Sequence, residues 1–300
     1  MKRICFVLFC LLCVSTTLAQ SPSVALTFDD LPAAGTSDTT EIRAINLAIL
    51  NSLDRHHAPA TAFVIGQNAH LTSESWPMLE EWKHRGYTLG NHTWSHPNFA
   101  DLTIVQEEDD ILKGERAIAP LLAPGIKFLR FPYNGTGDTS EKHDAILSFL
   151  KAHHYQIATC TIDNEDYVFA AVYNKMLARH DADAAARLRA AYLDYTATEI
   201  DYYTHLHKQI FGREIPHVML LHASRLNADM INQVLALFTV RGYQFVTLTQ
   251  AQSDPGYATP DTYATKYGPM WGYRWAKELG ISLKNNHETE PPTWISEYGK

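Results

Sequence analysis

Two adjacent acidic residues, Asp29 and Asp30, follow directly after an apolar segment that extends from Val24 to Phe28. Neighbouring carboxylates repel each other, and they are costly to place beside a hydrophobic core. A surface turn is the simplest explanation, because Asp is common in turns and at the starts of helices. The other explanation is that a cation lies beside both side chains and offsets their repulsion.

A pair of histidines could supply the other ligands of a cation. His92 and His96 lie in the segment NHTWSH, four residues apart, and on a helical turn this spacing places both imidazoles on one side. The H-x-x-x-H spacing alone is a weak signal. Two His and one carboxylate, however, can bind a metal and leave positions open for water and substrate. One Asp of the pair is then a ligand, and the other is a base for the water that the metal activates.

Short apolar segments alternate with longer segments of helical spacing. The predicted strands are 24–28, 61–65, 87–90, 127–131, 155–161, 217–221 and 243–248, and the predicted helices are 41–56, 75–85, 105–122, 141–153 and 228–241. Such alternation is typical of βα units and a parallel sheet. We therefore expect an α/β fold, a distorted and incomplete (β/α) barrel of about seven parallel strands. A doubly wound open sheet is the alternative.

Residues with useful chemistry lie at the ends of five of these strands. They are Asp29 and Asp30, His92 and His96, Arg130 with Pro132 and Tyr133, Asp163 and Asp166, and His222. In a parallel barrel the carboxyl ends of all strands lie on one face, which is where active sites form. The pattern therefore predicts that these residues share one site.

Two segments depart from the alternation. Residues 168–214 are rich in Ala, Tyr and charged residues and predict a helical insertion after the fifth strand. Its position predicts a cover over the barrel mouth, and an ordinary barrel helix that has grown longer is the alternative. Residues 254–300 are rich in Gly, Pro, Tyr and Trp and predict a C-terminal extension packed on the barrel of residues 20–253.

The N-terminus has the features of a secretory signal peptide over residues 1–19. Lys2 and Arg3 precede an apolar segment, 4–14, and a cleavage site of small residues at 17–19. We expect export to the periplasm or the medium, with no transmembrane anchor after signal removal. Three of the four cysteines lie in this segment, so the mature chain keeps only Cys160 and has no internal disulfide. The net charge of -8 does not favour nucleic-acid binding.

Five segments, TFDD, HTWSH, RFPY, DNEDY and LLH, resemble in this order the five motifs of the polysaccharide deacetylases, carbohydrate esterase family four. The resemblance covers about residues 24–250 and implies a distorted βα barrel with one divalent metal, commonly zinc. It implies an acetylated glycan as substrate: N-acetylglucosamine-type sugars of chitin or peptidoglycan, or O-acetylated xylan. A metal-dependent amidase or imidase that acts on a small molecule is an alternative, and a carbohydrate-binding protein with a decayed site is another.

Position by position, the resemblance implies a role for individual residues of this chain. The implied metal ligands are Asp30, His92 and His96. The implied catalytic set is Asp29 as base, Arg130 as the group that holds this base, His222 as general acid, and Asp166 as the carboxylate that orients and charges His222.

The walls of the site are less well defined. The resemblance implies that the backbone N–H of Tyr133 binds the oxyanion, and Trp94, inside the metal motif, is a candidate for the pocket wall. Three positions depart from the family pattern. Tyr167 replaces the usual Trp, Asn134 precedes Gly, and Ala223 follows the last His in place of an acidic residue. These departures change the pocket walls without removing a catalytic group, so the sequence leaves the substrate open.

Overall fold

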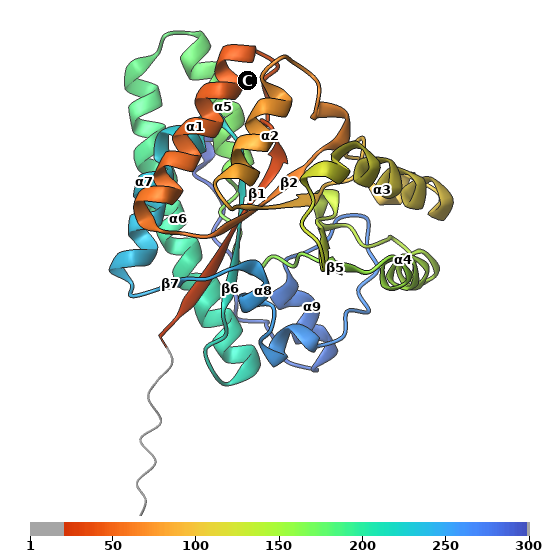
Figure 1. Ribbon diagram of the computed structural model, residues 1–300. Helices are drawn as coiled ribbons and strands as arrows, with labels where there is room; N and C mark the ends of the chain where they lie inside the picture. Colours follow the sequence, from red (N-terminus) through yellow and green to blue (C-terminus); the bar gives the residue numbers. More distant parts are fainter. Residues whose placement is uncertain (1–20, 299–300) are drawn as a thin grey trace, which may run out of the picture.

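The computed structural model describes residues 21–298, so the predicted signal peptide of residues 1–19 lies outside the described residues. A seven-stranded parallel sheet forms the centre of the molecule (Figure 1). Its strands are β1 (Ser23–Leu31), β2 (Ala60–Val64), β3 (Thr88–Asn91), β4 (Lys127–Leu129), β5 (Tyr155–Ile157), β6 (His217–His222) and β7 (Gln244–Phe245). The strand order is β5-β4-β3-β2-β1-β6, and β7 pairs with the start of β1.

The sheet closes into a distorted barrel just after β5. Ile162 forms an isolated parallel bridge with Met219 of β6, and the backbone N–H groups of Thr161 and Ile162 donate to the Val218 carbonyl at 2.9 and 3.1 Å. The predicted strand 155–161 is therefore divided: its first residues pair with β4, and its end approaches β6. This closure selects the predicted barrel over the open sheet.

Five helices follow the predicted positions closely. They are α1 (Thr39–His56), α2 (Ser75–His84), α3 (Ile104–Ile118), α4 (Ser140–Ala152) and α7 (Arg225–Val240). Four of them begin after a residue whose side-chain oxygen accepts a hydrogen bond from the backbone N–H three positions later: Asp38, Thr103, Thr139 and Ser224. Such caps satisfy N–H groups that have no partner within the helix, which explains where these helices start.

Short 3-10 helices connect several of these elements. They are η1 (Gly66–Asn68), η2 (Phe99–Asp101), η3 (Ala119–Leu121), η4 (Pro132–Asn134) and η5 (Pro255–Ala258). The central strands β1, β2 and β6 are apolar and almost entirely buried, as expected for a parallel sheet that is covered on both faces.

The inserted segment after β5 forms two helices, α5 (Asp166–Ala178) and α6 (Ala182–Phe211). The 30-residue α6 packs against α5, α7 and α9 (Trp271–Glu278) and runs along the outside of the barrel (Figure 1). Its inward face, which includes Leu188, Tyr192 and Tyr203, is buried in the main core. The expected cover is therefore wrong for α6, which corresponds to the alternative of a lengthened outer helix.

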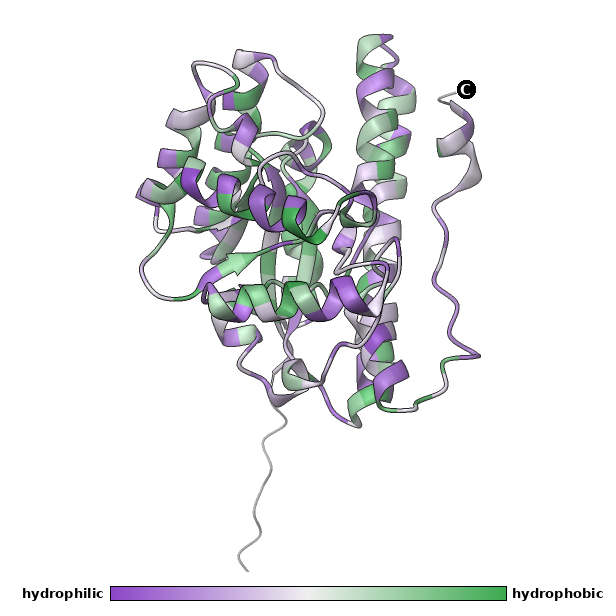
Figure 2. Ribbon diagram, turned by 90° about the vertical axis from the view of Figure 1, so that its right-hand side faces the viewer, coloured by the Kyte–Doolittle hydropathy of each residue, from purple (hydrophilic) through white to green (hydrophobic). Residues whose placement is uncertain are grey.

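The C-terminal segment continues from α8 (Leu248–Ala251) through α9 to α10 (Thr293–Tyr298) and runs beside α6 (Figure 2). Trp271 and Trp275 of α9 are buried. The hydroxyl of Tyr195 on α6 donates to the Thr289 carbonyl at 2.5 Å, and Tyr203 donates to Glu288. None of the helices within residues 21–298 is both long and apolar enough to span a membrane.

Candidate active site

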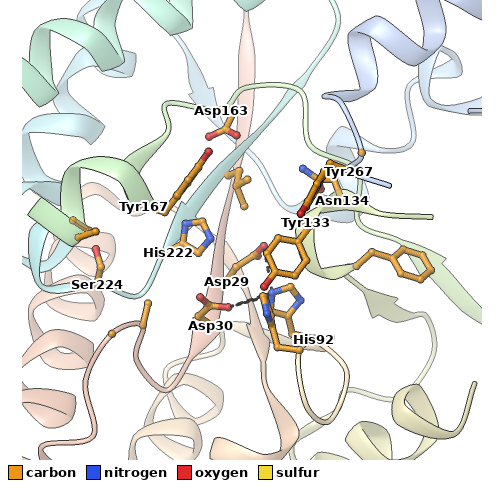
Figure 3. Close-up of a pocket in the computed structure, with 18 of the residues that line it drawn as sticks. Asp29, Asp30, His92, Tyr133, Asn134, Asp163, Tyr167, His222, Ser224 and Tyr267 are labelled. Carbon is orange, nitrogen blue, oxygen red and sulfur yellow. Dashed lines mark ion pairs between the residues drawn. The ribbon is translucent and has the colours of Figure 1, made fainter. Parts of the chain in front are cut away.

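A cavity of about 670 Å³ opens at the carboxyl ends of the strands (Figure 3). Strand ends and the loops that follow them contribute Asp29, Asp30, His92, His96, Tyr133 and His222 to its lining. Arg130 and Asp166 lie behind this lining, in contact with Asp29 and His222. The structure thus brings together the residues that the sequence placed at separate strand ends.

Asp30, His92 and His96 form a set of metal-ligand groups whose ligand atoms all lie within 4.8 Å of one another. Oδ1 of Asp30 lies 3.4 Å from Nε2 of each histidine. Nδ1 of His92 lies 2.8 Å from the Arg130 carbonyl, so a proton on Nδ1 leaves the Nε2 lone pair facing Asp30. Two imidazole nitrogens and one carboxylate oxygen converge here, and this donor set fits a divalent metal.

The backbone of the histidine segment is not the helical turn on which the H-x-x-x-H spacing argument was based. Residues 92–98 form an irregular loop, in which Thr93 and His96 have φ of 61° and 56°. The His96 N–H donates to Thr93 Oγ1 at 3.1 Å, and Asp30 also has a positive φ, 63°. Left-handed backbone is strained for residues other than Gly and clusters at functional sites. The histidines therefore converge through a sharp bend.

Electrostatics suit these residues to bind a cation. Burial and the neighbouring His92 lower the pKa of His96 to about 4, so this imidazole is neutral and has a free lone pair at pH 7. Burial alone would raise the pKa of Asp30, but the hydrogen bond with His92 and the nearby charge of His222 hold it well below its usual range. Asp30 is therefore ionised.

Arg130 holds Asp29 in place beside the metal-ligand set. Nη1 of Arg130 donates to the two Asp29 oxygens at 3.2 and 3.4 Å, and its other nitrogens donate to Thr27 Oγ1 at 3.1 Å and to the Ala158 carbonyl at 2.8 Å. Both partners are buried, and Oδ2 of Asp29 lies 3.8 Å from Nε2 of His92. Thr27 is not among the site residues predicted from the sequence. Its position two residues before Asp29, on the same face of the strand, was the available signal.

His222 is paired with a fully buried carboxylate at the start of α5. Its Nδ1 lies 2.6 Å from Oδ1 of Asp166, and its backbone N–H donates to Oδ2 at 2.7 Å. Asn227 donates to Asp166 Oδ2 and, at 2.8 Å, to the His222 carbonyl. Burial would lower the pKa of His222, but Asp166 raises it to about 10, so the imidazole is protonated at neutral pH. The sequence held no signal for Asn227.

The cavity walls differ in part from the expectation. Tyr133 and Tyr167 line the cavity, whereas Trp94 does not. The backbone N–H of Trp94 donates to the Asp110 carbonyl of α3, and the Trp94 ring lies 4.1 Å from Lys113 Nζ on the same helix. This contact turns Trp94 toward α3. Tyr267 of the C-terminal segment lines the cavity instead, and the many aromatic residues of that segment were its only signal in the sequence.

Known proteins resemble this chain over much of its length. A sequence model of the polysaccharide deacetylase family matches residues 19–153. A peptidoglycan-N-acetylglucosamine deacetylase of Bacillus cereus is 31% identical over 145 residues, which are 48% of this chain and 46% of that protein. A chitin deacetylase of a Pestalotiopsis species is 29% identical over 154 residues, 51% of this chain and 46% of that protein. The chain thus spans slightly less than half the length of each of these two relatives.

Solved structures share the fold. A family-four carbohydrate esterase pseudoenzyme from Bacillus anthracis superimposes with a TM-score of 0.55 and 15% identity, over 77% of this chain and 66% of that chain. At this identity the likeness shows the barrel and does not show activity. The sequence match, the fold and the residues at the strand ends agree, and residues 19–153 of the chain match the polysaccharide deacetylases, a family of hydrolases.

Proposed function

We propose that the protein is a metal-dependent hydrolase that removes N-acetyl groups from glycans containing N-acetylglucosamine, of the chitin-oligomer or peptidoglycan type. The observation that carries this proposal is that one cavity holds a buried carboxylate, a metal-ligand set and a charged histidine: Asp29, Asp30 with His92 and His96, and His222. The names of the two relatives, a peptidoglycan-N-acetylglucosamine deacetylase and a chitin deacetylase, support the substrate class.

We propose zinc as the metal, because zinc readily accepts imidazole nitrogen and carboxylate oxygen in sites with open positions. Asp30, His92 and His96 would hold it. When bound, a divalent ion polarises the acetyl carbonyl and makes a nearby water molecule more acidic.

Asp29 is placed to act as the general base. Arg130 fixes its carboxylate next to the metal-ligand set, where it can take a proton from the attacking water. The backbone N–H of Tyr133, at the edge of the same cavity, stabilises the negative charge that develops on the carbonyl oxygen.

His222 is placed to act as the general acid. It is protonated at neutral pH because Asp166 raises its pKa to about 10, and it can donate this proton to the leaving nitrogen. An amine is a poor leaving group without such a proton, whereas an alcohol needs it less. The strongly held proton of His222 therefore supports an amide substrate over an acetate ester.

The test is a measurement of acetate release from N-acetylglucosamine oligomers by residues 20–300 in the presence of zinc. Asp29→Asn should lose about 10²- to 10⁴-fold in turnover while keeping its fold and metal, since one positioned proton-transfer group contributes this much. The exposed Asp144→Asn is the matched control. Acetylated xylan and small cyclic or linear amides form the comparison set. If acetylated xylan or a small amide reacts faster than the N-acetylglucosamine oligomers, that compound class is the better assignment of the substrate.

The metal site has its own test. His92→Ala combined with His96→Ala should abolish stoichiometric zinc, measured by elemental analysis after gel filtration, because two of three ligands are lost. Zinc that stays at one equivalent in the double variant would place the metal elsewhere.

We also propose export of the protein, on the basis of its signal-like residues 1–19. N-terminal sequencing of the secreted or periplasmic protein tests this proposal.

A further inference from the structure

Exposed aromatic side chains gather at one place on this molecule. Among the Phe, Trp and Tyr residues of the described chain, those classed as exposed are Tyr133, Tyr167 and Tyr267, at 52%, 54% and 61% exposure. All three line the cavity that holds the metal-ligand set. Large aromatic surface left open at a single cavity indicates a ligand that covers it.

The three rings flank the reaction centre from two sides (Figure 3). The ring of Tyr167 meets His222 edge-on, with centroids 6.1 Å apart. On the other side, Tyr133 contacts the ring of His96 at 5.1 Å, and Tyr267 contacts Tyr133 at 6.3 Å. The rings of His96, Tyr133 and Tyr267 thus form a row, in which each ring contacts the next. Tyr267 lies at the end of this row that is farther from the metal ligands. A group bound against Tyr267 therefore lies beside the reacting group.

Tyr267 belongs to the C-terminal segment, outside the residues 19–153 that match the family. Two backbone hydrogen bonds fasten this segment to the loop after β4: Gly268 N–H donates to the Tyr133 carbonyl at 3.1 Å, and Thr265 N–H donates to the Gly137 carbonyl at 2.9 Å. A Cβ on Gly268 would lie 1.8 Å from the Asn134 carbonyl oxygen, so the close approach requires glycine.

A buried arginine completes the attachment. Nη1 of Arg274 donates to Thr136 Oγ1 at 3.0 Å and to Asp261 at 2.8 Å, and Nη2 donates to the Asn134 carbonyl. Its guanidinium also stacks on Trp271, 4.0 Å from the ring centroid. The position of Tyr267 relative to Tyr133 is therefore set by a network centred on the buried Arg274, even though the tyrosine ring itself is open to the cavity.

We propose that Tyr267 is a substrate-binding residue, which the C-terminal segment adds to the reaction site, and that it packs against the C–H face of the sugar ring next to the acetylated one. This assignment rests on the proposed glycan deacetylase function. An aromatic ring presents a flat apolar surface, which matches the apolar C–H face of a sugar ring. The residue sets how strongly neighbouring sugars contribute to binding, and it does not take part in proton transfer.

The kinetic test compares Tyr267→Ala and Tyr267→Phe with the wild type on N-acetylglucosamine oligomers of two to five units and on 4-nitrophenyl acetate. Tyr267→Ala should raise KM for the longer oligomers about tenfold, the loss expected for one aromatic contact, and leave kcat and the small ester unchanged. Tyr267→Phe should restore the wild-type KM. Tyr263→Ala, in the same segment but outside the cavity lining, is the control. Equal effects on ester and oligomers, or no effect of chain length, would overturn the assignment.

A binding measurement separates this inference from the proposed activity. Calorimetric titration of the same oligomers into zinc-loaded Asp29→Asn protein, with and without Tyr267→Ala, reports binding without turnover. The wild type could release no acetate while the oligomers still bind and Tyr267→Ala lowers their affinity about tenfold. In that case the proposed activity is wrong, and the assignment of Tyr267 as a binding residue is supported. If the wild type releases acetate and the oligomers bind equally well with and without Tyr267→Ala, only the assignment of Tyr267 is wrong. Absence of oligomer binding to either protein also overturns it.

Discussion

His222 carries its positive charge at neutral pH because a buried carboxylate compensates for burial of the ring. Asp166 contacts both its Nδ1 and its backbone N–H, and Asn227 holds the same carboxylate from the other side. An acid that donates to a leaving amine must still be protonated when the substrate is bound. In the proposed mechanism, the contact with Asp166 therefore sets the alkaline limit of activity.

Asp166→Asn should move the alkaline limb of the kcat/KM profile to lower pH. If His222 is the general acid, as we propose, its protonated form is the active one, so activity is lost as pH rises through its pKa, and removal of the nearest negative charge lowers that pKa from about 10. We expect a displacement of about one to three pH units, the usual effect of one close charge. The measurement is kcat/KM between pH 6 and 11, with zinc content and thermal unfolding as controls. A limb that does not move would exclude His222 as the acid.

At the scale of elements, α3 positions the histidine loop by lying unusually close to it. A Cβ on Gly114 of α3 would lie 2.5 Å from Asn91 Oδ1, 2.6 Å from the Thr93 carbonyl carbon and 2.8 Å from its oxygen. Thr93 stands between His92 and His96, so α3 cannot move inward without displacing the metal-ligand set. Gly114 is thus needed for contact and is poorly suited to a helix by its intrinsic propensity.

Gly114→Ala separates these two effects by sign. Helix propensity alone predicts that the variant is more stable by up to about 1 kcal/mol. The steric conflict predicts instead a loss of about 1–3 kcal/mol, the usual cost of overpacking, together with weaker zinc binding because Thr93 is pushed aside. Urea unfolding of the zinc-free protein and a competitive zinc titration measure the two quantities. A stabilised variant with unchanged zinc affinity would show that the histidine loop moves to accommodate the Cβ without affecting the metal-ligand set.

The sequence predicted the seven strands because each is a short apolar segment that ends in polar residues. It also predicted the shared site, since parallel strands present these ends on one face. It could not predict that the chain leaves β4 after β5 and pairs with Met219 at Ile162, or that Trp94 turns toward Asp110. These outcomes depend on hydrogen bonds between distant segments, which local periodicity does not encode. The outward course of α6 likewise follows from packing against α7 and α9.

At the scale of the whole molecule, the inserted helices, the loop after β5 and the C-terminal segment meet around a cluster of acidic groups. Thr196 of α6 accepts a hydrogen bond from Asn164 at 2.9 Å, and Tyr203, seven residues later on the same face, donates to Glu288. Glu199 lies between them on this face and is fully buried. Burial, with the charges of Glu288 and Glu165, raises the pKa of Glu199 to about 8, so the folded chain holds this carboxyl protonated at pH 7.

Glu199→Gln should therefore stabilise the protein in a pH-dependent way. In the unfolded chain a Glu ionises near pH ~4.3, whereas in the fold Glu199 stays protonated up to pH about 8. Between these values the folded state binds one proton more than the unfolded state, so wild-type stability falls as pH rises through the window. Gln cannot ionise and escapes this loss. Urea unfolding should show the variant near wild type at pH 5 and clearly more stable at pH 8, while the exposed Glu297→Gln shows no such trend. A stability difference that is constant from pH 5 to pH 8 would mean that Glu199 is already ionised in the folded protein.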